Sequence, residues 1–204
     1  MNISESPYKG SGSLSREQFL FYEMRTTANL MCEGLSDKEI IQRIIDDNLL
    51  QYPTERSIKK MARVCVERLN SLSDDSLVRA IASADSVTAK QVCLYAMMKF
   101  YRLVWDFMIT VIGAKYRNCD TTFSRRDLSV FFLQLQEQDP VVASWSESTI
   151  KKIESVLIRL LIENEYIDSG KATVLNPVLI SSTLENSIRE SGDLFALSAF
   201  NCIS

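Results

Sequence analysis

The sequence predicts a mostly helical fold: a multi-helix amino-terminal bundle around a long central apolar helix, then a winged-helix-like unit with a short β-hairpin. Two observations predict the helices. Capped segments with apolar residues at a 3.6-residue period follow one another, and strand signals are scarce. A third observation predicts the winged helix, since a helix at 150–164 precedes a hairpin signal at 166–175.

Three helices are expected in the first part of the chain, at 16–33, 37–47 and 54–69. Ser15 caps the first, and Gly34 stops it. The second opens with a capping box formed by Ser36 and Glu39, and the third follows Pro53. The short connection between the second and third helices resembles that of a helix-turn-helix, in which the second helix enters the major groove.

The middle of the chain predicts a short acidic helix at 74–83 and a long helix at 88–112. The long helix is apolar nearly all round, so other helices should surround it. Lys99, Arg102 and Asp106 interrupt its apolar run, which excludes a span of the roughly 18 uncharged residues that a membrane requires. We therefore expect a buried central helix and no membrane partner.

The last part of the chain predicts helices at 124–138, 150–164 and 183–190, with the hairpin after the second. The first of these starts at Ser124, with Asp127 three residues on. The expected organisation is a flexible tail at 1–14, a helical bundle with the helix-turn-helix-like pair at 15–117, a winged-helix-like domain at 118–191 and a tail at 192–204.

Composition limits the possible functions. The 204 residues include 46% hydrophobic ones, enough to bury a core. Lys and Arg number 23 against 26 Asp and Glu, so nucleic-acid binding would need local basic faces. No histidine is present, which removes the commonest general base and metal ligand. We expect a protein that is not an enzyme, with no catalytic residue, cofactor or metal.

Five cysteines lie far apart, and most have apolar neighbours. They form no C-x-x-C pair, so they predict small buried residues in a reducing cytoplasm. The first thirteen residues lack the basic start and apolar run of a signal peptide. A cytoplasmic location is the expectation.

The helix at 54–69 carries a candidate DNA-binding stripe. Its basic residues fall at i, i+3, i+4 and i+7, which places them on one face: Arg56, Lys59, Lys60 and Arg63. Arg and Lys on such a face can bind phosphates and base edges. The alternative is the solvated face of an ordinary amphipathic helix.

The presumed recognition helix carries a second candidate set, Ser148, Thr149, Lys151 and Lys152, with Arg159 further along and Lys171 at the wing tip. Hydroxyls and free backbone N–H groups near a helix amino terminus suit a phosphate oxygen. Glu147 and Glu154 cancel part of this charge. The alternative is a winged helix used only for packing against proteins.

The order and spacing of several short motifs resemble the BrxA family over roughly residues 15–190. These motifs are Tyr22-Glu23-Met24-Arg25, Glu33-Gly34-Leu35, Asn48-Leu49-Leu50-Gln51, Lys99-Phe100-Tyr101-Arg102, Asp139-Pro140, Trp145-Ser146-Glu147-Ser148-Thr149 and Leu175-Asn176-Pro177. BrxA is a small component of the BREX systems with which bacteria exclude phage.

The resemblance implies a non-enzymatic, mostly helical protein that binds double-stranded DNA. It would act beside the BREX methyltransferase, ATPase and phosphatase-like component. The first part of the family fold is likened to NusB, an RNA-binding antitermination factor, which keeps RNA as a second possible ligand. A third possibility is an adaptor that packs against other defence proteins. The resemblance carries no catalytic residue and no DNA-contact signature.

Overall fold

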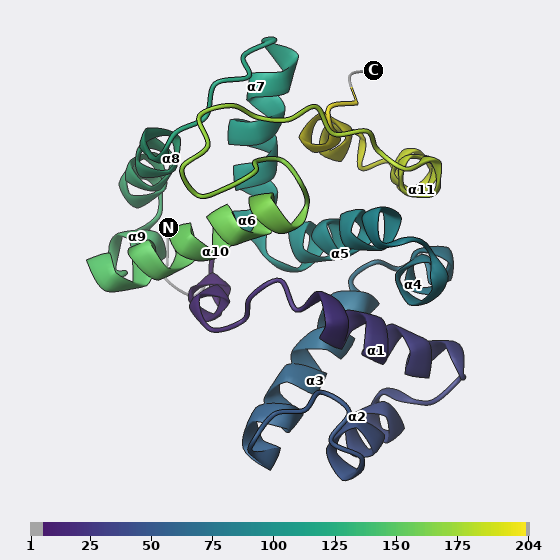
Figure 1. The fold of residues 1–204 in the computed structure, drawn as a ribbon. Helices are drawn as coiled ribbons and strands as arrows, with labels where there is room; N and C mark the ends of the chain where they lie inside the picture. The colour runs from purple at the N-terminus through teal and green to yellow at the C-terminus, as the bar shows by residue number, and fades with distance from the viewer. Residues whose placement is uncertain (1–5, 203–204) are drawn as a thin grey trace. The chain divides into compact units, whose positions relative to one another are not determined.

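The computed structural model describes residues 6–202, and these divide into two compact units (Figure 1). One unit, here the α1–α5 unit, comprises residues 19–100 and 181–187. The other, the α6–α10 unit, comprises the described parts of residues 1–18, 101–180 and 188–204. Helix α11 (Ser182–Ser191) begins in the α1–α5 unit and ends in the α6–α10 unit.

The α1–α5 unit holds α1 (Phe21–Cys32), α2 (Asp37–Asp46), α3 (Glu55–Asn70), α4 (Asp75–Ser83) and α5 (Ser86–Phe100). The expected capping box starts α2, where Ser36 accepts from the Glu39 backbone N–H and the Glu39 carboxylate accepts from the Ser36 N–H at 2.9 Å. Helix α1 packs on α3 and α4, and α2 packs on α3. A cluster of buried side chains from α1, α2 and α3 forms one part of the core, and it includes Ile40, Ile44, Ile58, Ala62 and Val66.

The connection between α2 and α3 runs over residues 47–54. This is about twice the three to four residues that join the helices of a DNA-binding helix-turn-helix. The side chain of Tyr52 is half-buried in this connection, and its hydroxyl donates to Glu23 of α1 at 2.8 Å. Any role of α3 in binding therefore depends on its own exposed face rather than on a tight turn before it.

The α6–α10 unit holds η2 (Ser11–Ser15), α6 (Arg102–Phe107), the π-helix η3 (Met108–Gly113), α7 (Ala114–Arg117), α8 (Arg125–Gln138), α9 (Pro140–Ala143), α10 (Glu147–Glu163) and η4 (Leu194–Phe200). Ser124 and Asp127 form the expected capping box of α8. The Asp139 carboxylate accepts from the backbone N–H groups of Val141 and Val142 and so starts α9. The π-helix packs against η4.

The helix expected at 88–112 is divided at Tyr101, whose backbone is extended. The Tyr101 side chain is buried, and its hydroxyl donates to the Glu17 carboxylate at 2.6 Å. This long-range bond gives the buried Tyr101 hydroxyl a partner. In a continuous helix this hydroxyl would need a different partner. The apolar run thus supplies α5 to one unit and α6 with the π-helix to the other.

The predicted β-hairpin was wrong, because the described residues contain no strand. Residues 173–175 form hydrogen bonds with the segment before α8 and not with a second arm of a hairpin. The Phe123 N–H donates to the Thr173 carbonyl at 2.9 Å, and the Leu175 N–H donates to the Thr121 carbonyl at 2.7 Å. These bonds leave a single antiparallel bridge between Thr122 and Val174.

The side chains of the expected first arm of the hairpin also exclude a wing. Tyr166 and Ile167 are consecutive, and both are buried. A two-stranded wing would point neighbouring side chains to opposite faces. The Tyr166 hydroxyl instead donates to the Ala199 carbonyl of η4 at 2.9 Å. The region after α10 is therefore an irregular segment anchored to η4, and the mostly helical class of the fold is confirmed.

Both predicted tails lie partly within the described residues. Residues 1–5 and 203–204 are outside them. Leu14 of η2 is buried, as are Leu197, Ala199 and Phe200 of η4. Within the described residues, no helix has both the length and the apolar character needed to cross a membrane.

Gly113 allows the close packing of the π-helix on η4. A Cβ at this position would lie 2.5 Å from the Ser198 Oγ and 3.1 Å from the Ser198 carbonyl carbon. Gly113→Ala should lower the free energy of unfolding by about 1–3 kcal/mol through overpacking. Urea unfolding monitored by circular dichroism measures this loss.

The matched control is Gly12→Ala, whose Cβ would meet Trp145 at an ordinary 3.8 Å. It should change stability by less than about 0.5 kcal/mol, because the added Cβ makes only an ordinary van der Waals contact. Equal stability of the two variants would contradict the steric role of Gly113.

A second stability prediction concerns Asp120, which precedes α8. Hydrogen bonds from the Thr122 hydroxyl and backbone, and then from Lys115, lower the pKa of its carboxyl from 3.8 to about 2. A folded-state pKa below the unfolded one stabilises the protein above the unfolded value, and that stability is lost as pH falls through the folded value. Asp120→Asn should therefore cost stability at pH 7, and the cost should shrink between about pH 4 and pH 2.

Urea unfolding of the wild type and Asp120→Asn at pH 7, 4 and 2.5 tests this. Thr122→Val removes the hydroxyl that donates to Asp120 at 2.6 Å, so it should weaken the acid dependence as well. A stability difference between Asp120→Asn and the wild type that stays constant with pH would refute the prediction.

Candidate functional site

The outer face of α3 carries the four predicted cations. Ile58, Ala62 and Val66 turn the other face into the core, so the helical period places Arg56, Lys59, Lys60 and Arg63 in solvent. These four side chains, with Val64 and Glu67, line a shallow groove of about 400 Å³. The structure therefore brings the whole predicted stripe together.

Most of the stripe is electrostatically uncompensated. Among the described residues, Arg56, Lys59 and Arg63 have no carboxylate within ion-pair distance. Glu67 is the one acidic residue in the groove lining. The face can bind an anion without first breaking a salt bridge at these three positions.

The amino terminus of α10 is a cluster of hydroxyl groups. Ser146 caps the helix, and its Oγ accepts from the Thr149 N–H at 3.2 Å. The same Oγ lies 3.0 Å from the Ser148 Oγ and 2.9 Å from the Thr149 Oγ1. Thr149 is therefore occupied by capping, whereas Ser148 is exposed on the outside of the first turn.

Lys151 is paired within α10. Its Nζ lies 2.6 Å from the Glu147 carboxylate one turn earlier, and both side chains are mostly exposed. The hydrogen bond between them raises the pKa of Lys151 and lowers that of Glu147. This pairing neutralises one of the cations predicted for the site.

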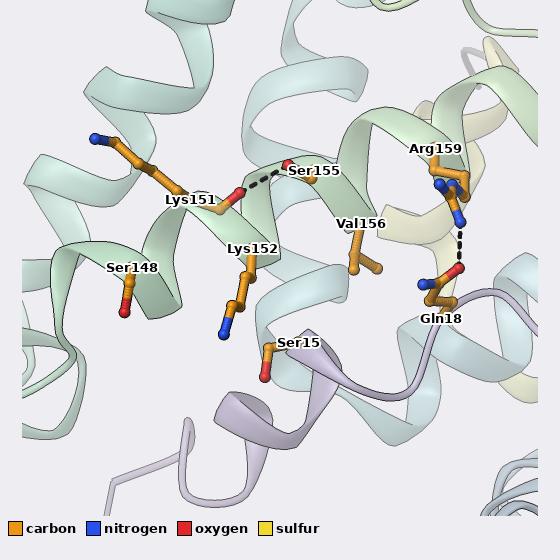
Figure 2. A pocket seen from close by; sticks show the side chains of 8 residues that line it. All are labelled: Ser15, Gln18, Ser148, Lys151, Lys152, Ser155, Val156 and Arg159. Atoms are coloured by element: carbon orange, nitrogen blue, oxygen red, sulfur yellow. Dashed lines mark hydrogen bonds between the residues drawn. The ribbon is translucent and has the colours of Figure 1, made fainter.

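A pocket of about 450 Å³ lies between α10 and the segment that contains η2, both in the α6–α10 unit. Its cationic lining residues are Lys151, Lys152 and Arg159, and its hydroxyl-bearing ones are Ser15, Ser148 and Ser155. Gln18 and Val156 complete the lining. Figure 2 shows Ser148, Lys152, Val156 and Arg159 on the face of α10 turned toward Ser15 and Gln18, whereas the Lys151 ammonium points away.

Two of the pocket cations, Lys152 and Arg159, differ in whether they bind another side chain. Lys152 has no ion-pair partner among the described residues. Arg159 donates to the Gln18 side-chain oxygen, a neutral acceptor that leaves its charge uncompensated. Burial raises the pKa of the half-buried Glu154 carboxyl on α10, and the positive charges of Arg125 and then Lys151 offset part of that rise.

The structure groups the predicted residues differently from the sequence. Ser148, Lys151 and Lys152 share the pocket, but Thr149 does not line it. Lys171 is exposed in a turn closed by the Ala172 N–H to the Ser169 carbonyl at 3.0 Å, so it lies at no wing tip. The α3 stripe belongs to the other unit.

The sequence prediction omitted four lining residues: Ser15, Gln18, Ser155 and Val156. The i, i+4, i+8 spacing of Ser148, Lys152 and Val156 continues to Arg159, a signal that could have placed it on this face. No sequence signal could have indicated Ser15 and Gln18, which come from a distant part of the chain.

The side chains of these two faces are mostly cationic or hydroxyl-bearing. The described residues contain no group of three or more His, Cys, Asp or Glu arranged to hold a metal ion. The accessible functional groups are mainly ammonium, guanidinium and hydroxyl donors, with the Glu67 carboxylate in one lining and the Gln18 amide in the other. The fold thus defines a small helical protein with two groups of exposed cationic side chains, one on α3 and one on α10.

The chain belongs to the BrxA family, whose family model matches residues 7–192. Two relatives named BREX protein BrxA are similar over most of both chains. The one from Bacillus cereus (strain H3081.97) is 33% identical over 94% of each chain, and the one from Paramagnetospirillum magneticum is 25% identical over 96% of each. A third, from Escherichia coli O9:H4, is 26% identical over 83% of this chain and 79% of its own length.

A solved structure has the same fold. The crystal structure of an uncharacterized protein from Magnetospirillum magneticum matches with a TM-score of 0.79. The match covers 93% of this chain and 96% of that chain, at 22% sequence identity. It supports the helical architecture over nearly all of the chain.

Proposed function

We propose that this protein is a non-enzymatic component of a BREX phage-defence system that binds double-stranded DNA mainly through the phosphate backbone. The observation that carries the proposal is the uncompensated stripe on α3, where Arg56, Lys59 and Arg63 are exposed and unpaired among the described residues. Family membership supplies the setting, because the relatives carry the name BREX protein BrxA.

The physical basis is local charge on a protein of overall negative charge. The formal net charge is −3, so no global positive field attracts DNA. Binding must come from a few cations that each displace a counterion from a phosphate. Such contacts give weak sequence preference and steep salt dependence.

The non-enzymatic part of the proposal rests on the absence of histidine from all 204 residues and on the ordinary donor chemistry of both faces. All five cysteines are free thiols, which fits a reducing cytoplasm, where duplex DNA is available in bacteria. The other BREX proteins, including the methyltransferase, the ATPase and the phosphatase-like component, are the proposed protein partners.

A second function, as an adaptor between defence proteins, has one observation in its favour. Phe195 and Leu194 at the start of η4 are 78% and 50% exposed. Large aromatic side chains that remain in solvent often anchor protein interfaces. Copurification with other BREX proteins in the absence of any nucleic-acid binding would favour this function over the first.

Duplex binding can be tested by fluorescence anisotropy with matched double-stranded DNA, single-stranded DNA and RNA over a salt series. The wild type should prefer the duplex. Lys59→Ala with Arg63→Ala should weaken duplex binding at least tenfold at low salt and reduce the slope of log affinity against log salt by about 2, one unit for each lost phosphate contact.

The matched control is Lys38→Ala with Arg79→Ala, two exposed cations of the same unit outside the groove. It removes the same charge but should leave the salt slope unchanged. If the control and the stripe variant lose the same affinity, the stripe is not the DNA-binding face. If the wild type binds RNA more tightly than duplex DNA, RNA replaces duplex DNA as the proposed ligand.

A further inference from the structure

The pocket between α10 and η2 differs in kind from the stripe on α3. The stripe lies along one helix and includes Glu67, whereas the pocket has walls from two segments and no carboxylate among its lining residues. Its polar lining consists of three cations, three serines and Gln18. A concave site with only donors and neutral groups favours a compact ligand with several negative charges.

The wall opposite α10 is held in place by buried contacts. Glu17, which precedes Gln18, is turned inward, where it accepts from Ser13 at 2.8 Å and from Tyr101 at 2.6 Å. Helix η2 packs on α10. Gly12 of η2 lies against the side chain of Trp145, which comes just before α10. The carboxylate is thus kept out of the pocket, and the pocket is formed before any ligand arrives.

The donors lie in a row. Ser148, Lys152 and Arg159 share one face of α10, and the last two stand at i and i+7, on the order of 10 Å apart along the axis. Ser15 and Gln18 face them from the other wall (Figure 2). Such a row can satisfy successive phosphate groups, each of which accepts several hydrogen bonds.

The lining also lacks the means to read a base. It contains no aromatic side chain on which a base could stack, and Val156, its apolar residue, is largely buried. Recognition must therefore depend on phosphate and not on the base.

We propose that this pocket binds an oligophosphate, such as the phosphate chain of a nucleoside triphosphate or the phosphorylated end of a DNA strand. Lys152 and Arg159 supply the charge, and Ser148 and Ser15 supply neutral donors. The base is not recognised. This site is separate from the stripe on α3 and does not depend on duplex binding by that stripe.

Isothermal titration calorimetry of the full chain with sodium tripolyphosphate, ATP, GTP and adenosine tests the proposal. Tripolyphosphate, ATP and GTP should bind at one site with affinities within about threefold of one another, and adenosine should not bind. Lys152→Ala and Arg159→Ala should each weaken tripolyphosphate binding about tenfold, the usual effect of removing a charged hydrogen bond. Circular dichroism melts check that both variants fold.

Two controls separate this site from the duplex-binding face. Arg117→Ala removes an exposed cation of the same unit that lies outside the pocket and should bind tripolyphosphate as the wild type does. Lys59→Ala with Arg63→Ala should also retain full tripolyphosphate binding, even if it loses the duplex. Loss of duplex binding and loss of oligophosphate binding are therefore separate results.

A competition experiment distinguishes the two sources of phosphate. A 5′-phosphorylated duplex that displaces a fluorescent ATP analogue better than the same duplex with 5′-hydroxyl ends indicates a strand end as the ligand. If both duplexes displace the analogue equally and weakly, the ligand of the pocket is a free nucleotide. The proposal fails if tripolyphosphate does not bind, if Lys152→Ala and Arg159→Ala bind it normally, or if Arg117→Ala weakens binding as much as they do.

Discussion

The burial of one face of each long helix fixes where the charges of this protein can lie. On α3, Ile58 and Ala62 are held in the core, so Lys59 and Lys60, which lie on the other side of the helix, face water. A rotation of α3 by one position would bring a cation into the core, where an unpaired charge costs several kcal/mol. On α10, the buried Ile153 and Leu157 direct Lys152 outward in the same way.

This constraint explains why helix positions could be predicted and the candidate site only in part. The capping boxes of Ser36 and Ser124 depend on neighbouring residues, so local sequence specifies them. The stripe on α3 follows from one helical period. The pocket on α10 needs Gln18, which is distant in sequence, and no local pattern encodes that proximity.

Two wrong or incomplete predictions have the same physical origin. The hairpin was expected from a local turn signal, but Thr173 and Leu175 bond to residues before α8. The long apolar helix was expected from composition, but Tyr101 leaves the helical conformation and bonds to Glu17. In both places a long-range hydrogen bond overrides a local preference. Backbone and hydroxyl groups that are buried must find partners wherever the fold offers them.

The contact between Gly113 and Ser198 restricts how the sequence of this family can diverge. The two residues lie on segments that are far apart along the chain, yet a side chain on the π-helix would occupy the position of the Ser198 Oγ. A larger residue at 113 therefore becomes acceptable only after η4 shifts or after residue 198 shrinks to glycine. The two positions should change together over evolution. Residue 198 should become smaller first, and residue 113 can become larger only afterwards.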